Sequence, residues 1–203
     1  MTGWIEDAAA LEQLYGDPVE AATVKVADRL TPEYRAWIQA APFCALATAG
    51  PDGLDCTPRG DDGPVVHIVD DRTLALPDRR GNNRIDSLRN IVRDPRVSLM
   101  LLIPGAGTVI RVNGTGRITA EPGWLERFAT RGQLPRTVLV LSVAEVYFQC
   151  ARAVLRSRLW DGGIADPEAL PSPGRILEAM SGAAIDGAAY DADWPSRAAR
   201  TMW

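Results

Sequence analysis

The sequence predicts a mainly β protein with peripheral helices, in which six or seven antiparallel strands form a barrel. From residue 43 onward, short β-rich runs are separated by turn signals such as Gly50-Pro-Asp-Gly53 and Gly60-Asp-Asp-Gly63. One amphipathic helical pattern is inserted after the fourth of these runs. Short, regularly spaced strands of this kind favour a barrel over an open parallel sheet.

The 203 residues suffice for one sizeable core, so we expect one domain with extensions. A helical extension is expected over residues 1–41, the barrel over 42–161, and a tail with one short helix over 162–203. Apolar residues at helical spacing predict a first helix within residues 4–15, which Gly16-Asp-Pro18 ends. Thr31 and Pro32 are typical of a helix start, and this second helix should run to about Ala41.

The strands are expected to alternate with turns as far as residue 147. The first four should form a meander, the apolar run at 97–103 should be buried on both faces or nearly so, and Gly114 and Gly116 are plausible bulges. A helix capped by Ser172 is expected near the end, with loosely structured chain from Gly182 onward. The expected strands are residues 43–49, 54–59, 65–69, 73–76, 97–103, 109–118 and 137–147.

Composition excludes several classes of function. The net charge of −4 argues against a general nucleic-acid binder and favours a small anionic partner. Three widely spaced cysteines without a CxxC motif indicate neither a disulfide framework nor a zinc site. No secretory signal or membrane-length apolar run is evident, so we expect a cytoplasmic protein without membrane contact. His67 is the single histidine, which excludes a His-rich metal centre within one chain.

The most informative stretch is residues 74–91, which reads as a strand, a basic loop and an amphipathic helix. Arg79, Arg80 and Arg84 crowd the start of this helix, where the macrodipole disfavours cations. A bound phosphate would offset this, because a helix start offers free N–H donors and arginines offer paired donors. The alternative is a solvated basic loop with an Asn cap.

Several motifs in order resemble those of the pyridoxamine 5'-phosphate oxidase-like flavoproteins. They are T-P-R-G-D at 57–61, L-P-D-R-R-G-N-N-R at 76–84, D-S-L-R-N-I at 86–91, D-P-R-V at 94–97 and R-V-N-G at 111–114. The tail C-A-R-A-V-L-R-S-R-L-W-D at 150–161 is similar to that of a bacterial subgroup of the family. The resemblance covers about residues 40–161, and it implies a split β-barrel, a homodimer, and FMN bound across the dimer interface.

The resemblance also implies which residues bind the cofactor. Arg59 matches an arginine near the phosphate or ribityl chain, and Thr57 and Pro58 would line the isoalloxazine edge through backbone contacts. Arg111 resembles a basic position on the long strand; the alternative is an exposed strand arginine. The phosphate-binding loop falls on Arg79, Arg80, Asn82, Asn83 and Arg84.

Arg156, Ser157 and Trp160 follow the last strand, in a region that the family places near the partner's flavin. Arg156 and Trp160 are four residues apart and would share one face of a helix, so we expect them to help shape the cofactor pocket. The alternative is that Trp160 packs the tail onto the barrel, with Arg156 over its ring.

These observations lead us to expect an FMN-dependent oxidoreductase that acts on an unknown small molecule. FMN itself supplies the reactive atom, so no protein base is obligatory for hydride transfer. The alternatives are a flavin-binding carrier or sensor without turnover, and a split barrel that binds heme or a deazaflavin. Heme would require an axial ligand, for which His67 is the single available imidazole.

Overall fold

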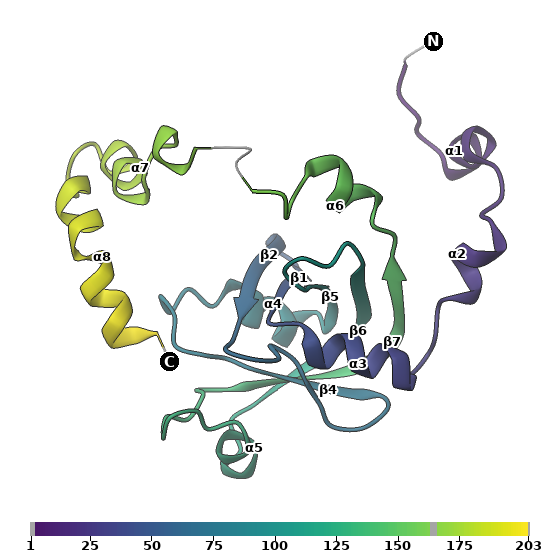
Figure 1. Ribbon diagram of the computed structural model, residues 1–203, viewed down its shortest axis with the longest axis horizontal. Helices are drawn as coiled ribbons and strands as arrows, with labels where there is room; N and C mark the ends of the chain where they lie inside the picture. Colours follow the sequence, from purple (N-terminus) through teal and green to yellow (C-terminus); the bar gives the residue numbers. More distant parts are fainter. Residues whose placement is uncertain (1–2, 163–165, 203) are drawn as a thin grey trace.

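The computed structural model describes residues 3–162 and 166–202 (Figure 1). No helix within these ranges is long and apolar enough to cross a membrane. A 3-10 helix, Pro167–Ala169, precedes the last two α-helices of the chain. The other elements are α1 (Ala8–Tyr15), α2 (Glu20–Val24), α3 (Pro32–Ala40), β1 (Phe43–Gly50), β2 (Gly53–Gly60), β3 (His67–Ile68), β4 (Thr73–Pro77), α4 (Asp86–Arg93), β5 (Arg96–Leu102), β6 (Val109–Thr119), α5 (Pro122–Arg127), β7 (Val138–Gln149), α6 (Arg152–Ser157), α7 (Pro173–Met180) and α8 (Gly187–Thr201).

The seven strands form one antiparallel sheet in the order β2-β1-β5-β6-β7-β4-β3. α4 is inserted between the fourth and fifth strands of the chain, so the predicted set of antiparallel strands with one inserted helix is confirmed. β2 and β3 are the two edges of this sheet, and within the described residues they do not pair with each other. The sheet is therefore not closed into a continuous barrel.

The predicted meander of the first four strands is wrong. β2 pairs with β1 and β3 pairs with β4, but the second neighbour of β1 is β5. The chain after β2 does not turn back along it, because the amides of Asp61 and Val65 donate to carbonyl oxygens just before β1. This path carries the chain away from β2 and towards the opposite edge of the sheet.

The main core lies on one face of the sheet. Ile38 of α3 and Ile91 of α4 pack into the same cluster as the strand side chains, which fixes both helices against that face. Four residues that oppose one another across neighbouring strands are at most 1% exposed: Leu46, Leu99, Val112 and Val146.

The opposite face is less well covered. In β5, Val97 and Leu99 face the core and are buried, whereas Met100 points to the opposite face and is 43% exposed. Phe43 of β1, two residues away from the partner of Met100, is 39% exposed on the same face. The expectation that residues 97–103 are buried on both faces, or nearly so, is therefore wrong for a single copy, because no helix in the described part of the chain shields Met100.

A bulge interrupts the pairing of β6 with β7. The register shifts after Asn113, so Ala144 of β7 has no partner on β6. Gly114 fits this position because a Cβ there would overlap the carbonyl oxygen of Ser142. The predicted bulge at Gly114 is confirmed. Gly116 keeps regular pairing, so the bulge predicted there is wrong; a Cβ there would instead meet a side chain of β7.

Both ends of the chain carry helices outside the barrel (Figure 1). α1 and α2 bury no residue, although the cap of α1 is formed by Asp7. α7 begins after the predicted Ser172 cap and packs against α8, where Asp191 accepts hydrogen bonds from Ser172 Oγ and Gly174 N. The tail thus holds two helices and a 3-10 turn, and the expectation of one short helix followed by loose chain is wrong. α8 forms because its alanines favour helix and Asp186 caps it.

Replacement of Gly114 by Ala is expected to lower the free energy of unfolding by about 1–3 kcal/mol, because the added methyl group forces the backbones of β6 and β7 apart. Gly123→Ala in α5 is the matched control, since its Cβ would enter open space. Urea unfolding monitored by circular dichroism measures both. Equal midpoints for the two variants would contradict the close approach at Gly114.

Candidate functional site

The loop between β4 and α4 ends in an uncapped helix start. Ile85 occupies the N-cap position, and no side chain in the described part of the chain accepts a hydrogen bond from the first-turn amides. The Asn cap that the solvated-loop alternative requires is therefore missing. Asn82 Oδ1 instead accepts from the backbone N–H of Arg84 at 3.0 Å, which shapes the loop. Free amides and the helix dipole make this end of α4 suited to an anion.

Two of the three loop arginines face solvent. Arg80 is exposed, and Arg84 is 80% exposed while its Nε donates to Asp86 at 2.5 Å. An ion pair this exposed contributes little to stability, so Arg84 can exchange it for another anion at small cost. Asn83 adopts a left-handed conformation with φ of 63° and accepts a hydrogen bond from Arg136 at 2.8 Å, which brings a further arginine to the loop.

Two other predicted site arginines are engaged inside the protein. Arg59 Nη1 donates to Asp78 at the end of β4, and both side chains are mostly buried. Arg79 donates from Nε to Asp61 at 2.8 Å and from Nη1 to the carbonyl oxygen of Phe128 at 2.7 Å. The Arg79 and Asp61 side chains are 15% and 14% exposed. These contacts attach the loop to β2 and to the segment after α5.

The residues predicted from β2 and β6 divide between the two faces of the sheet. Thr57 and Arg59 lie on the face of the main core, and Pro58 lies on the opposite face because side chains alternate along a strand. Arg111 lies on the same face as Pro58, where its guanidinium stacks 5.1 Å from the ring of Tyr147. The structure therefore brings Arg59 to the basic loop, and it gives Arg111 an aromatic partner on the other face.

The predicted tail residues do not share a helix face. α6 ends at Ser157, and Arg158 is left-handed with φ of 52°, so Trp160 lies outside the helix. Trp160 Nε1 donates to the carbonyl oxygen of Ala106 at 2.7 Å, which ties the tail to the β5–β6 turn. Arg156 bonds back to Arg152 O and Ser157 to Val154 O. The common helical face expected for Arg156 and Trp160 is wrong, while a role for either at a cofactor stays a prediction.

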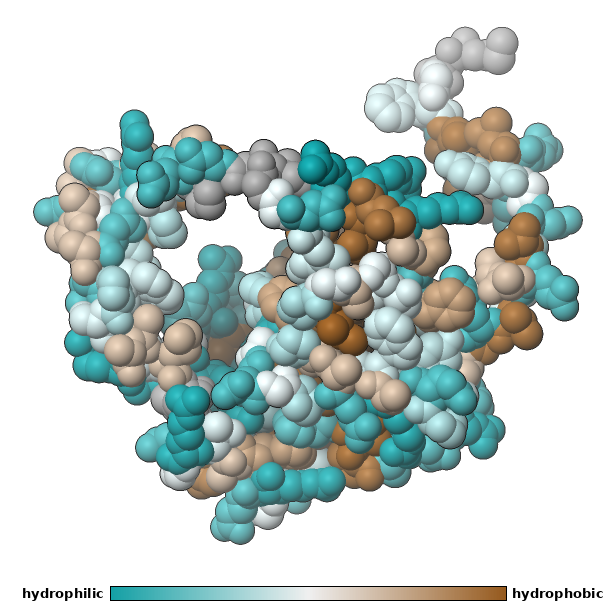
Figure 2. Space-filling model, in the orientation of Figure 1, coloured by the Kyte–Doolittle hydropathy of each residue, from teal (hydrophilic) through white to brown (hydrophobic). Residues whose placement is uncertain are grey.

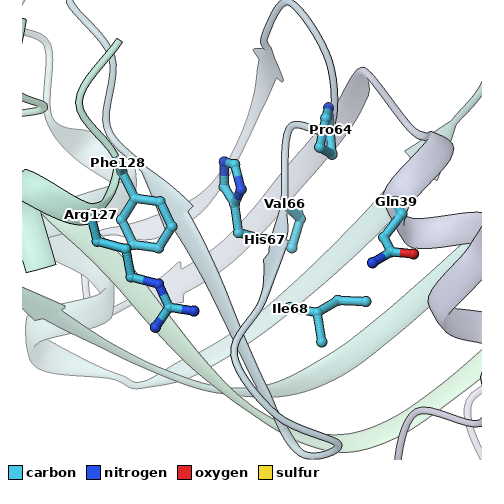
Figure 3. A pocket seen from close by; sticks show the side chains of 7 residues that line it. All are labelled: Gln39, Pro64, Val66, His67, Ile68, Arg127 and Phe128. Atoms are coloured by element: carbon cyan, nitrogen blue, oxygen red, sulfur yellow. The ribbon is translucent and has the colours of Figure 1, made fainter. Parts of the chain in front are cut away.

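A pocket of about 270 Å³ lies beside the loop (Figure 3). His67 and Phe128 face each other there with ring centroids 4.8 Å apart, and His67 Nε2 is buried without a hydrogen-bond partner among the described residues. Burial, followed by the charge of Arg79, lowers the pKa of His67 below its ordinary value of 6.5. The walls are Gln39, Pro64, Val66, His67, Ile68, Arg127 and Phe128.

The sequence did not predict this pocket. Gln39 comes from α3, Arg127 from the end of α5, and the histidine from a two-residue strand, so three separate segments must fold before the walls meet. The one available signal was the single histidine, whose orientation alternation alone left open. Arg79 connects the pocket to the basic loop, because it binds the Phe128 carbonyl and lowers the His67 pKa.

Comparison with known families identifies the class of protein. The family model described as pyridoxamine 5'-phosphate oxidase matches residues 30–150, more than half of the chain, and the chain belongs to this family. The split-barrel fold implied by the sequence motifs is thus the fold of this protein, with the sheet open between β2 and β3. No curated protein sequence matches.

Solved structures with a similar chain path come from several bacteria. HupZ of Group A Streptococcus has 17% identity and a TM-score of 0.49, with 60% of this chain and 94% of that chain covered. General Stress Protein 26 of Bacillus anthracis str. Sterne has 18% identity and a TM-score of 0.42, with 56% and 88% covered. An FMN-binding protein of Syntrophomonas wolfei subsp. wolfei has 16% identity and a TM-score of 0.41, with 56% and 79% covered.

Asp61→Ala is expected to lower the free energy of unfolding by about 3 kcal/mol, because it leaves the mostly buried Arg79 guanidinium without its carboxylate. The neighbouring Asp62→Ala is the control: its carboxylate is 92% exposed and 3.7 Å from an exposed arginine, so the change should stay within about 0.5 kcal/mol. Denaturant unfolding of the two variants checks this. A similar small effect in both would show that the ion pair between Arg79 and Asp61 does not stabilise the fold.

The lowered pKa of His67 predicts a pH dependence of stability. The unfolded chain binds a proton on this histidine more readily than the folded protein, so the contribution is complete above pH 6.5 and is lost as pH falls through the folded-state pKa. Between pH 7.5 and 5, the parent protein should lose more stability than His67→Gln, which cannot titrate; carboxylates common to both proteins cancel. Parallel pH profiles from thermal unfolding would show that His67 titrates normally.

Proposed function

We propose that this protein binds FMN through the loop between β4 and α4 and is an oxidoreductase acting on a small molecule. The observation that carries the proposal is the uncapped start of α4 beside exposed Arg80 and Arg84. Backbone amides and guanidinium groups together match a terminal phosphate dianion. No Gly-x-Gly-x-x-Gly turn for a dinucleotide is present in the sequence, which favours FMN over FAD.

The residues around the loop support this assignment. Asn82 and Asn83 offer exposed amides next to the arginines, while Arg79 and Arg59 neutralise Asp61 and Asp78 inside the protein. Without these two pairs, both carboxylates would repel a phosphate. Thr57 and Pro58 remain candidates for backbone contacts to the ring system, and Arg111, Arg156, Ser157 and Trp160 remain candidates for contacts across a dimer. FMN, when bound, supplies the hydride acceptor.

The pocket at His67 is the proposed place of the small substrate. Its volume of about 270 Å³ lies just below the range of about 300–1,000 Å³ that is usual for ligand sites, so it suits a compact molecule. Phe128 offers a flat apolar wall, Gln39 an amide, and neutral His67 a nitrogen without a hydrogen-bond partner among the residues that the structure describes. These groups can orient a planar ligand with hydrogen-bonding substituents without supplying a proton.

A homodimer is part of the proposal. Met100 and Phe43 expose apolar surface on the side of the sheet that lies opposite the main core. A two-fold axis would let the same surface of a second copy cover it. Pro58 and Arg111, two of the proposed cofactor residues, lie on this face.

The absorbance spectrum of the purified protein, with the released cofactor identified by mass, tests the proposal directly. A flavin spectrum bleached by NADPH, followed by return of the colour in air, supports an oxidoreductase. A bound flavin that is reduced slowly or not at all supports a carrier or sensor instead. A heme spectrum or a deazaflavin mass would replace FMN as the cofactor.

Arg84→Ala is expected to weaken FMN binding by about 1.5–3 kcal/mol, the scale of one charge-assisted hydrogen bond. The control is Arg96→Ala, which removes an equally exposed guanidinium at the start of β5, outside the loop. Quenching of flavin fluorescence on titration into the cofactor-free protein measures both affinities. Wild-type affinity in Arg84→Ala, or FAD in the extracted protein, would show that the loop does not bind an FMN phosphate.

A further inference from the structure

Residues 3–24, the N-terminal arm, place apolar side chains in water. α1 and α2 bury no residue, and Figure 2 shows apolar atoms at the surface of the arm at the upper right. Leu11, Leu14 and Tyr15 form one stripe on α1 because they are three and four residues apart, and Tyr15 is 82% exposed. A helix of eight residues is marginal in water unless its apolar side packs against something. Packing of this stripe against another surface would therefore stabilise the arm.

Within the described residues, the chain is attached to its own barrel just after the arm ends. Ala27 exchanges two backbone hydrogen bonds with Val146 of β7, and the Lys25 ammonium lies 4.9 Å from the ring centre of Phe148. Tyr34 Oη donates to Lys25 O at 2.6 Å. These contacts fix the point at which the arm leaves the barrel, beside the last strand.

The arm is strongly acidic. It contains five carboxylates and no Lys or Arg, so the arm alone carries more formal negative charge than the net −4 of the whole chain. A matching surface should therefore be both apolar and basic. The acidic residues of the arm are Glu6, Asp7, Glu12, Asp17 and Glu20.

The surface around α6 has this combination, and we call it the α6 patch. Leu155 and Leu159 are exposed there, and Trp160 is 37% exposed. Three exposed arginines surround these side chains. Arg156 makes no ion pair within the described residues, because its Nε donates to the backbone carbonyl oxygen of Arg152. The patch consists of Arg152, Leu155, Arg156, Arg158, Leu159 and Trp160.

We propose that the N-terminal arm of one copy packs on the α6 patch of a second copy of this chain. Within one copy the arm and the patch stay apart and both remain exposed, as Figure 1 shows for α1 and α6. A two-fold dimer would bury both surfaces twice, with opposite charges facing each other. The inference rests on the homodimer of the proposed function, and it adds to that dimer an exchange of arms.

The dissociation constant of the dimer tests this contact. Leu14→Glu should raise it by about tenfold or more, the effect of losing one buried leucine from each of the contacts. Gln13→Glu is the matched control, because it adds the same charge on the opposite side of α1 and should change the constant by less than about twofold. Analytical ultracentrifugation measures both. Equal constants for the two variants would overturn the proposal.

Cross-linking locates the partner. Chains with p-benzoylphenylalanine in place of Tyr15 are mixed with isotopically heavy chains, allowed to exchange, and irradiated. Cross-links from light to heavy chains, in peptides from residues 150–161, are expected. Cross-links confined to one chain would show that the arm folds back on its own barrel. If the unmodified protein stays monomeric at all concentrations, the homodimer fails; if it dimerises and only the cross-links or Leu14→Glu fail, the arm exchange alone is wrong.

Discussion

The guanidinium of Arg79 joins three segments that are distant in the sequence. It binds Asp61, where the chain leaves β2, and the carbonyl oxygen of Phe128, directly after α5. It thereby fixes the start of the basic loop relative to the edge of the sheet and to one wall of the His67 pocket. The same charge disfavours protonation of His67. The geometry of both candidate sites therefore depends on one mostly buried arginine whose side chain binds other parts of the protein.

The parts of the fold that could be predicted from sequence are those with local causes. Thr31 and Ser172 cap α3 and α7 as expected, since a cap depends on residues within one turn. The strands were found because their composition and their turns are local signals. Strand order was not, because the choice of β5 as neighbour of β1 depends on where the chain after Asp61 is bound. α8 was missed because small residues give little periodicity even where they favour helix.

The candidate site shows the same limit. The sequence predicted a site formed by five basic or amide residues of the loop. It could not show that the Arg79 side chain is mostly buried while that of Arg84 faces solvent. Arg156 and Trp160 have helical spacing, yet the left-handed Arg158 between them ends the helix. The pocket could not be predicted from the sequence, because Gln39 and His67 come to line it together only when α3 packs on the sheet.

The bulge in β7 determines where this strand can change its length during evolution. Val143 and Val146 are three positions apart, and in a regular strand an odd spacing would place them on opposite faces. Both face the core because Ala144 is an extra residue without a partner on β6. Loss of Ala144 would restore strict alternation and leave every later side chain on its present face. Loss of the neighbouring Glu145 would do the same, because either residue can be the one that pairs with Asn113. Relatives with a β7 that is one residue shorter should therefore have lost the residue equivalent to Ala144 or Glu145, and with it the need for glycine at the position of Gly114.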